Sequence, residues 1–356
     1  MSDPSGPPAV GLMPAEWEPH AATWLSWPAN PDDWPDKLEA VRWVYPEMVR
    51  VLAGSERVEI LCRDEQVLAD ARRRLEAHRV DPSGYRLHVV PTDRGWMRDA
   101  APTAVRGPDG RIVWVAWRFN AWARYDNWGL DAAIPDAVGR ITGLPVVRAM
   151  RPDRPDEPLV LEGGGIETDG AGTLLVTEEC FQSDIQQRNP GLDRRGYEQA
   201  FAAWLGIRKT IWLGAGCAGD DTHGHVDDIA RFTDPRTVVL AFEPDPADAN
   251  HAASADNLRR LRGATNAAGE PLRIVPLPMP RPVWYQDQRL PASYANFYIA
   301  NRAVIVPTFN DPADRVALET LAGLFPGRRV VGIHAVDLVL GQGTLHCLTQ
   351  QQPAGR

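Results

Sequence analysis

The sequence predicts a mixed α/β protein in which one ββαβ module repeats around a central axis, forming a five-bladed α/β propeller. Three observations support this prediction. Four segments have the pattern of β-hairpins and begin at residues 103, 165, 229 and 297, so that successive starts lie 62, 64 and 68 residues apart. Each hairpin is followed by a helical pattern and then by a short apolar strand. Proline and glycine are spread evenly, so no linker divides the chain.

Each predicted hairpin consists of two β-rich runs around a short polar turn. The four hairpins cover residues 103–119, 165–177, 229–242 and 297–308. Helical patterns with recognisable ends follow them. The clearest is PADRVALETLAGLFPG, in which we expect Asp311 to cap the helix, Pro312 to occupy its first turn and Gly327 to end it. Two further examples are residues 193–206 and 245–263.

The fifth module is completed only by joining the two ends of the chain. It combines a C-terminal strand around LHCLTQ (345–350), an N-terminal strand around ATWLSW (22–27), a helix within 37–52 and the strand VEILC (58–62). A ring that is closed by its own termini leaves few unprotected sheet edges. We therefore expect a single catalytic domain over residues 13–353, preceded by a flexible segment, residues 1–12.

Composition and charge exclude several classes of protein. Hydrophobic residues make up 44% and charged residues 24%, values that exclude whole-chain disorder and coiled coil. The formal net charge of −9 argues against nucleic acid or an anionic membrane as a partner and suits a small cation. The N-terminus lacks a signal-peptide pattern, so we expect a cytoplasmic protein. The four cysteines are far apart, which argues against a disulfide framework or a cysteine-rich zinc site.

Distinctive polar residues recur at one position of the modules, directly before or within the first strand of the hairpin. The motifs are WMRD at 96–99, EGGG at 162–165, HGHVDD at 223–228 and HC at 346–347. Equivalent positions of a propeller converge on its axis, so we expect one central site. It would contain Asp99, Glu162, His225, Asp227 and Cys347. Carboxylates that lie together need a cation to offset their repulsion.

Three carboxylates, an imidazole and a thiol suit a planar cation that is attacked by sulfur. A guanidinium carbon is a poor electrophile, so it needs carboxylates that hold its nitrogens and a strong nucleophile held close by. A thiol becomes a thiolate more readily beside a cation, which the substrate or a protonated His225 would supply. Loss of ammonia would leave a covalent amidino-thioester, which water activated by His225 would convert to a ureido product. This chemistry requires no cofactor and no metal.

Six ordered stretches together resemble one known family. They are MPAEWEPHAATWLSWP, WMRDAAP, LEGGGIETDGAGTLLVTEEC, GDDTHGHVDDIARF, PASYANFYIAN and GTLHCLTQQQP, which run from about Met13 to Pro353. The chain resembles the agmatine deiminase family, the bacterial-type relatives of peptidylarginine deiminase within the guanidine-modifying (pentein) superfamily. The resemblance implies a five-bladed α/β propeller that hydrolyses agmatine to N-carbamoylputrescine and ammonia, a step in putrescine biosynthesis.

The resemblance also implies roles for individual residues. Cys347 would be the nucleophile and His225 the general acid and base. Asp99 and Asp227 would hold the guanidinium, and Glu162 would orient either the guanidinium or the histidine. Trp96 is similar to the family tryptophan that lines the alkyl-chain channel, with core packing as the competing interpretation.

The sequence does not determine which chemical group the substrate carries beyond its guanidinium. This chain has His223 where family members commonly carry Asp or Asn, and Ala101 where they commonly carry Gly. Asp220 or Asp221 is a candidate to meet a terminal ammonium, although surface solvation explains this acidic run equally well. Arginine and peptidylarginine are therefore alternative substrates to agmatine.

Two other classes of function compete with a deiminase. HGHVDD is close to the HxHxDH zinc motif of the metallo-β-lactamase fold, which would make His223, His225 and Asp227 metal ligands. Against this zinc metallohydrolase, the last position is Asp228 and the hairpin period does not suit a two-sheet sandwich. A propeller used only for binding would not need Cys347 and His225. The oligomeric state is not encoded in these patterns, and a homodimer is the default expectation.

Overall fold

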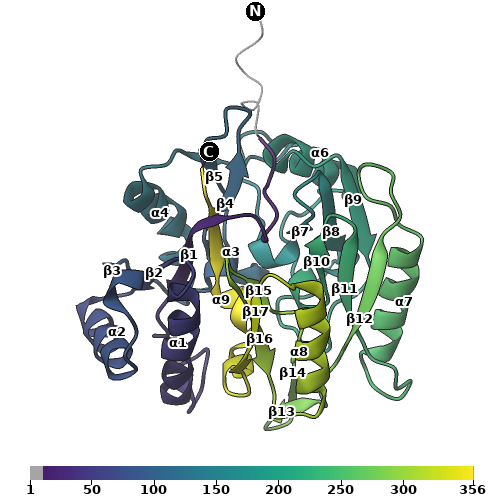
Figure 1. Cartoon of the computed structure of the whole chain (residues 1–356). Helices are drawn as coiled ribbons and strands as arrows, with labels where there is room; N and C mark the ends of the chain where they lie inside the picture. The colour runs from purple at the N-terminus through teal and green to yellow at the C-terminus, as the bar shows by residue number, and fades with distance from the viewer. Residues whose placement is uncertain (1–10, 356) are drawn as a thin grey trace, which may run out of the picture.

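Five β-sheets with one common strand order organise the part of the chain that the computed structural model describes, residues 11–355 (Figure 1). In each sheet the first two strands are antiparallel and the next strand is parallel to its neighbour. The predicted mixed α/β class is thus confirmed.

The sheets follow one another along the chain. The first contains β18 (Gln350–Pro353), β1 (His20–Ser26), β2 (Arg57–Cys62) and β3 (Tyr85–Val89). The next two are β4 (Thr103–Arg106), β5 (Ile112–Ala116) and β6 (Val146–Arg148), and β7 (Glu167–Thr168), β8 (Thr173–Thr177) and β9 (Lys209–Leu213). The last two are β10 (Ala230–Asp234), β11 (Thr237–Phe242) and β12 (Arg273–Pro278), and β15 (Tyr298–Ile299), β16 (Ala303–Thr308) and β17 (Arg329–His334).

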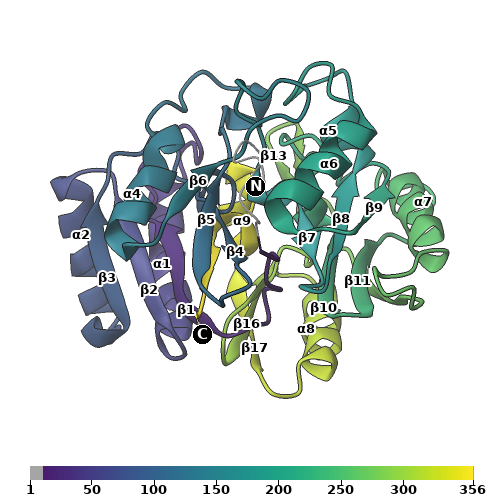
Figure 2. The ribbon, with the colours of Figure 1, turned by 90° about the horizontal axis from the view of Figure 1, so that it is seen from above.

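Helices connect the parallel strand pairs, because parallel strands need a crossover. These crossover helices are α1 (Leu38–Ala53), α2 (Glu65–Ala77), α4 (Ile134–Thr142), α6 (Arg194–Leu205), α7 (His251–Arg262) and α8 (Ala313–Leu324). Seen from above in Figure 2, α2 and α7 lie at opposite edges of the molecule, whereas the short helix α9 (Leu345–Leu348) lies near the middle. Apolar side chains such as Trp24, Tyr45 and Val304 fill the space between sheets and helices.

The four predicted hairpins are confirmed by their antiparallel registers, and so is the pairing of the two chain ends. Trp24 of β1 lies opposite Gln350 of β18. Helix α6 has the end signals that its sequence contains. Asp193 accepts a hydrogen bond from the Gly196 amide at 2.8 Å, and Gly206 ends the helix at φ +69°.

The expected C-terminal strand over residues 345–350 is wrong in its first part. Residues Leu345–Leu348 form helix α9, and the strand begins at Gln350. The cause is a distant side chain. Asn296 Oδ1 accepts hydrogen bonds from the amides of Thr344, His346 and Cys347 at 3.3, 3.0 and 3.4 Å, which satisfies the free amides of a helical turn.

Helix α8 also differs in detail from its prediction. Pro312 stands just before the helix, and Asp311 accepts from the Ala313 amide at 2.9 Å. The helix ends at Leu324, before Gly327, because the buried Phe325 leaves the helical conformation at φ −121° and ψ 61°.

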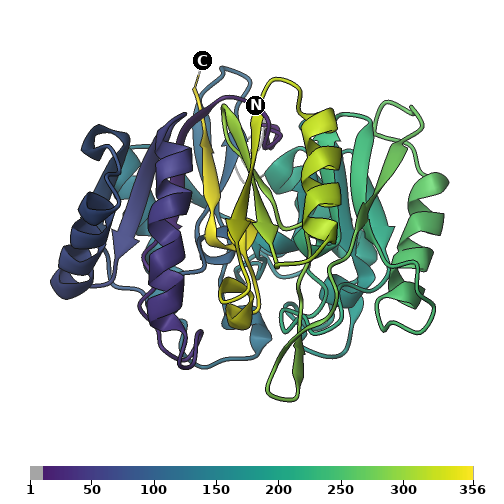
Figure 3. The same ribbon diagram turned by 60° about the horizontal axis from the view of Figure 1, so that its bottom comes forward.

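Several elements had no counterpart in the sequence analysis. They include α2 with β3, and the separate hairpin β13 (Val283–Tyr285) and β14 (Gln288–Leu290), which projects beyond the five sheets in Figures 1 and 3. The remaining short elements are α3 (Met97–Ala100), α5 (Glu178–Gln182), η1 (Pro82–Gly84), η2 (Ala121–Ala123), η3 (Asp131–Ala133), η4 (Gly163–Gly165), η5 (Val226–Asp228) and η6 (Leu338–Gly341).

The four motifs lie on short helical turns that precede the first strands of their sheets. WMRD ends in α3, EGGG forms η4, HGHVDD ends in η5 and HC lies in α9. Contacts join α3 to α9, α3 to η4 and η4 to η5, so the expected convergence of the motifs is confirmed.

The expected N-terminal segment comprises residues 1–12, of which residues 1–10 lie outside the described part of the chain. Leu12 exchanges two backbone hydrogen bonds with Arg106, at 2.9 and 3.0 Å. Within residues 11–355, no helix combines the length and the apolar character needed to cross a membrane.

Candidate active site

A cavity of about 750 Å³ opens beside the converging motifs. Four of the seven residues singled out from the sequence line it, namely Trp96, Asp99, Asp221 and Cys347. The other three, Glu162, His225 and Asp227, are fully buried behind its wall. The seven residues thus form one site with an accessible layer and a buried layer.

Cys347 lies in α9 with its thiol against two polar groups. Asn296 Nδ2 donates a hydrogen bond to Sγ at 3.0 Å, and Sγ lies 3.6 Å from Asp227 Oδ2. Burial raises the pKa of the thiol well above its usual range, and Asp227, Asp228 and Asp99 raise it further. In this state the sulfur therefore carries its proton.

Asp227 and Asp228 follow each other in η5 but have different partners. Asp227 Oδ2 accepts a hydrogen bond from His346 Nδ1 at 2.6 Å, whereas its Oδ1 has no partner among the described residues. Burial raises the pKa of Asp227, but the hydrogen bond and charge of His346 outweigh burial and lower it. Asp228 accepts from Asn296 at 2.9 Å, and burial followed by repulsion from Asp227 raises its pKa well above the usual range.

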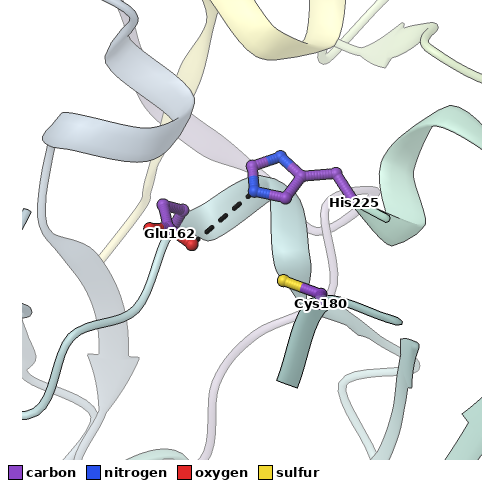
Figure 4. A group of neighbouring side chains, drawn as sticks. All are labelled: Glu162, Cys180 and His225. Atoms are coloured by element: carbon purple, nitrogen blue, oxygen red, sulfur yellow. Dashed lines mark ion pairs between the residues drawn. The ribbon is translucent and has the colours of Figure 1, made fainter. Parts of the chain in front are cut away.

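His225 lies between two carboxylates. Its Nδ1 is 3.8 Å from Asp99 Oδ1, and its Nε2 is 3.6 Å from Glu162 Oε2 (Figure 4). Burial lowers the pKa of the imidazole, but Asp99, Glu162 and Asp227 outweigh burial and raise it to about 9. The ring is therefore an imidazolium at neutral pH.

Asp99 reaches the cavity from α3. Its Oδ1 accepts from the Gly164 amide and its Oδ2 from Trp122 Nε1, both at 3.0 Å. Burial raises its pKa to about 6, with smaller contributions from Asp227 and Glu162 and an opposing one from His225. Asp99 is therefore ionised at neutral pH and faces the cavity.

Glu162 faces the histidine and does not line the cavity. Arg188 Nε donates to its two carboxylate oxygens at 3.3 and 3.2 Å. Burial raises the pKa of Glu162, but Arg188 and His225 outweigh burial and lower it. The resemblance left two roles open for Glu162, to orient the guanidinium or to orient the histidine. The geometry favours the second role.

The two acids of GDDTH differ in their position relative to the outer part of the cavity. Asp221 lines the cavity and accepts from the Tyr125 hydroxyl at 2.5 Å, with Arg124 Nε 3.8 Å away. Asp220 instead accepts from the amides of Thr222, Gly224 and His225, so it shapes the loop. Trp96 lines the cavity and packs on Trp34 at a centroid distance of 5.3 Å.

The three residues that HGHVDD would supply as zinc ligands do not come together in one group. His223 Nε2 lies 2.9 Å from Ser183 Oγ, and its Nδ1 lies 3.7 Å from Glu179. Within residues 11–355, two groups of side chains are close enough together to hold a metal ion, and neither contains His223. They are Glu162, Cys180 and His225, drawn in Figure 4, and Asp227, Asp228 and Cys347.

Sequence reasoning missed four residues of this site, Asn296, His346, Arg188 and Trp122. For Asn296 a signal was present, because it directly precedes the first strand of the fifth sheet, as the motifs do in the other four. His346 stands beside Cys347 in the HC motif. Nothing in the pattern marks Arg188 or Trp122, whose contacts depend on folded loops.

Comparison with known proteins identifies the family. The sequence profile described as "Porphyromonas-type peptidyl-arginine deiminase" matches residues 12–353. The chain belongs to this family. The deiminase is accordingly a hydrolase of the class that acts on carbon–nitrogen bonds in linear amidines.

Individual relatives cover almost the whole deiminase. A protein of Latilactobacillus sakei named "Putative agmatine deiminase" is 36% identical over 97% of this chain and 96% of its own length. The solved agmatine deiminase of Enterococcus faecalis is 31% identical, covers 96% of this chain and 95% of its own, and has a TM-score of 0.87. A substrate-bound agmatine deiminase of C. jejuni is 26% identical over 97% of both chains, with a TM-score of 0.84.

Proposed function

We propose that this deiminase hydrolyses agmatine to N-carbamoylputrescine and ammonia through a covalent intermediate on Cys347, a reaction that serves putrescine synthesis. The observation that carries the proposal is the position of the thiol. Cys347 faces a cavity of about 750 Å³ together with the carboxylate of Asp99, and the partly unpartnered carboxylate of Asp227 lies 3.6 Å from the sulfur. Buried carboxylates around a thiol fit a cation that the thiol attacks.

The first half of the reaction forms the carbon–sulfur bond. A guanidinium held by Asp99 and Asp227 offsets the negative charge that raises the pKa of the Cys347 thiol, so the bound substrate favours the thiolate and the thiol proton passes to solvent. The thiolate adds to the guanidinium carbon. His225, which is protonated below about pH 9, then gives its proton to the leaving nitrogen, and ammonia departs from an amidino-thioester.

The second half releases the product. His225 is now neutral and takes a proton from water, whose oxygen adds to the same carbon. The carbon–sulfur bond breaks, and the remaining proton of the added oxygen passes to the departing sulfur, so the ureido product and the resting thiol form. Glu162 holds the imidazole ring for both proton transfers, because Arg188 keeps this carboxylate ionised beside Nε2.

The charge of the cavity favours a substrate with a cationic tail. Five aspartates and two arginines line the cavity. Both arginines face aspartates, since Arg94 binds Asp33 and Arg124 lies 3.8 Å from Asp221. A second positive charge on the substrate is therefore attracted, whereas the carboxylate of arginine meets no free cation in this lining. We assign Asp221 as the group that meets the terminal ammonium.

A product assay tests this proposal. Ammonia and ureido product are measured for agmatine, arginine and an arginine-containing peptide, and agmatine is expected to have the highest kcat/KM. Cys347→Ala should abolish turnover, whereas Cys62→Ala, buried in β2, should retain it. His225→Ala should accumulate a substrate adduct on Cys347 in quenched samples. A preference for arginine or the peptide contradicts the assignment of agmatine, and full activity of Cys347→Ala contradicts the covalent mechanism.

We also propose that the five sheets are the blades of a five-bladed α/β propeller and that residues 13–353 form one catalytic domain. Two observations support this: the common strand order of the sheets and the pairing of β18 with β1.

A further inference from the structure

Behind Asp227, a line of three buried side chains leads away from the thiol. His346 Nδ1 lies 2.6 Å from Asp227 Oδ2, and His346 Nε2 lies 2.8 Å from Glu16 Oε2. The exposed fractions of Glu16, His346 and Asp227 are 5%, 1% and 0%. They come from three parts of the chain: the segment before β1, helix α9 and η5.

Glu16 is fixed firmly at the far end of this line. Arg98 Nη2 donates to its Oε2 at 3.1 Å, and Arg231 Nη2 donates to its Oε1 at 2.9 Å. The Ile299 amide donates to the same Oε1 at 2.8 Å. Burial raises the pKa of Glu16, but Arg231, His346 and Arg98 outweigh burial and lower it well below its usual range.

Both ring nitrogens of His346 therefore face ionised carboxylates. An ionised carboxylate only accepts hydrogen bonds, so both nitrogens must carry a proton for both bonds to form. Charge balance agrees with this assignment. Three buried carboxylates (Glu16, Glu167 and Asp227) face two buried guanidiniums (Arg98 and Arg231), and a protonated imidazole completes neutrality.

We propose that His346, held by Glu16, is a positioning residue that keeps Asp227 ionised and leaves one oxygen of its carboxylate free for the guanidinium. The hydrogen bond from His346 engages Oδ2, and Oδ1 has no partner among the described residues. This inference rests on the proposed deiminase reaction. Neither His346 nor Glu16 lines the cavity, so both act through Asp227.

The groups around Asp227 determine the expected dependence on pH. Those that face it from neighbouring elements are His346, His225, Arg231, Asp228, Asp99 and Cys347. His346 makes the largest contribution that lowers the pKa of Asp227, and burial opposes it. Without His346, only His225 and Arg231 oppose the effect of burial, so Asp227 is protonated at a higher pH.

The test uses His346→Gln, which removes the charge and leaves a polar side chain of similar reach. We expect kcat/KM at neutral pH to fall by about 10-fold to 10²-fold, the size of effect expected when a hydrogen bond to a charged group is lost. In the wild type the acidic limb lies near the pKa of Asp99, about 6, and in His346→Gln it should lie at a higher pH, because Asp227 becomes the first of the two carboxylates to take up a proton. Glu16→Gln should change both quantities in the same direction by a smaller amount.

A double-mutant comparison separates positioning from a general structural role. In the Asp227→Asn background, His346→Gln should lower kcat/KM by less than about threefold, because the carboxylate on which it acts is gone. His88→Gln is the matched control. The His88 ring lies 2.6 Å from Glu59, and neither residue lines the cavity, so the pH profile of His88→Gln should be that of the wild type.

Each outcome bears on the inference. A His346→Gln enzyme with a wild-type pH profile overturns it, and so does an undiminished loss in the Asp227→Asn background. If His346→Gln does not fold by circular dichroism, Glu16→Gln in both backgrounds makes the same comparison. A wild-type chain that releases no ammonia from any guanidine contradicts the proposed function, whereas normal wild-type turnover with an unshifted variant contradicts this inference alone.

Discussion

Asp99 of α3 and Asp227 of η5 lie near the thiol and carry the charge that would hold a guanidinium. Each contact of a carboxylate with a charged group contributes about 1.5–3 kcal/mol. Replacement of either by Asn keeps the shape and removes the charge, so Asp99→Asn and Asp227→Asn should each lower kcat/KM by at least about 10²-fold with the fold intact. Steady-state kinetics with circular dichroism checks this.

The matched control for these two variants is Asp245→Asn, an exposed acid that does not line the cavity. Asp32 is also exposed, but it is unsuitable as a control because it lines the cavity. If Asp99→Asn and Asp227→Asn behaved like Asp245→Asn, these carboxylates would not hold the substrate.

The pH dependence of the reaction follows from two residues with opposite requirements. Asp99 must be ionised to hold the cation, and its pKa is about 6, so kcat/KM should fall as pH drops through about 6. His225 must be protonated to assist the leaving group, and its pKa is about 9, so kcat/KM should fall as pH rises through about 9. A profile from about pH 5 to about pH 10 should be bell-shaped, and a flat profile would contradict these roles.

Among the elements, the glycine turn η4 depends on close packing at the site. A Cβ added at Gly164 would collide with His225 Nδ1 and lie 2.9 Å from Asp99 Oδ1. Gly164→Ala should therefore displace both groups and lower kcat by about 10²-fold or more, because small misplacements of catalytic groups are costly.

Helix α8 supplies the matched control for that change. A Cβ at Gly323 meets nothing within 4 Å. Gly323→Ala should keep full activity and raise the free energy of unfolding by about 0.4–1 kcal/mol, since alanine favours the helix. Kinetics and urea unfolding of both variants decide this, and equal activity of the two would show that η4 tolerates a side chain.

Element prediction succeeded where the signal is local and failed where it is not. The four hairpins and helix α6 follow from alternation, turns and caps within about 20 residues. Helix α9 was wrongly expected to be a strand. It is helical because the amides at its N-terminus bind Asn296, which is 48 to 51 residues away in sequence. No local pattern contains that partner.

At the scale of the whole molecule, buried ion pairs join the sheets to one another. Arg231 of β10 is fully buried, and it binds Glu16 before β1 and Glu167 of β7, both at 2.9 Å, and the Phe297 carbonyl at 2.5 Å. Arg231→Met would leave buried carboxylates without their partner, so we expect a loss of about 3–5 kcal/mol in the free energy of unfolding.

Arg236, in the turn between β10 and β11, supplies the comparison. Its side chain is 62% exposed and 3.5 Å from Glu270, so Arg236→Met should change the free energy of unfolding by less than about 0.5 kcal/mol. Denaturant unfolding monitored by circular dichroism measures both variants. Similar stabilities of the two would show that the buried network does not hold the sheets together.

The sequence by itself determined the repeated modules, the pairing of the chain ends and the set of chemical groups at the site, because period, turn chemistry and residue type are local properties. Only the tertiary structure decided how these groups face one another. It placed Glu162 against His225, chose Asp221 over Asp220 for the cavity and added Asn296, Arg188 and His346 as partners. The physical reason is that the direction of a side chain depends on packing between segments that are distant in sequence, which no local pattern records.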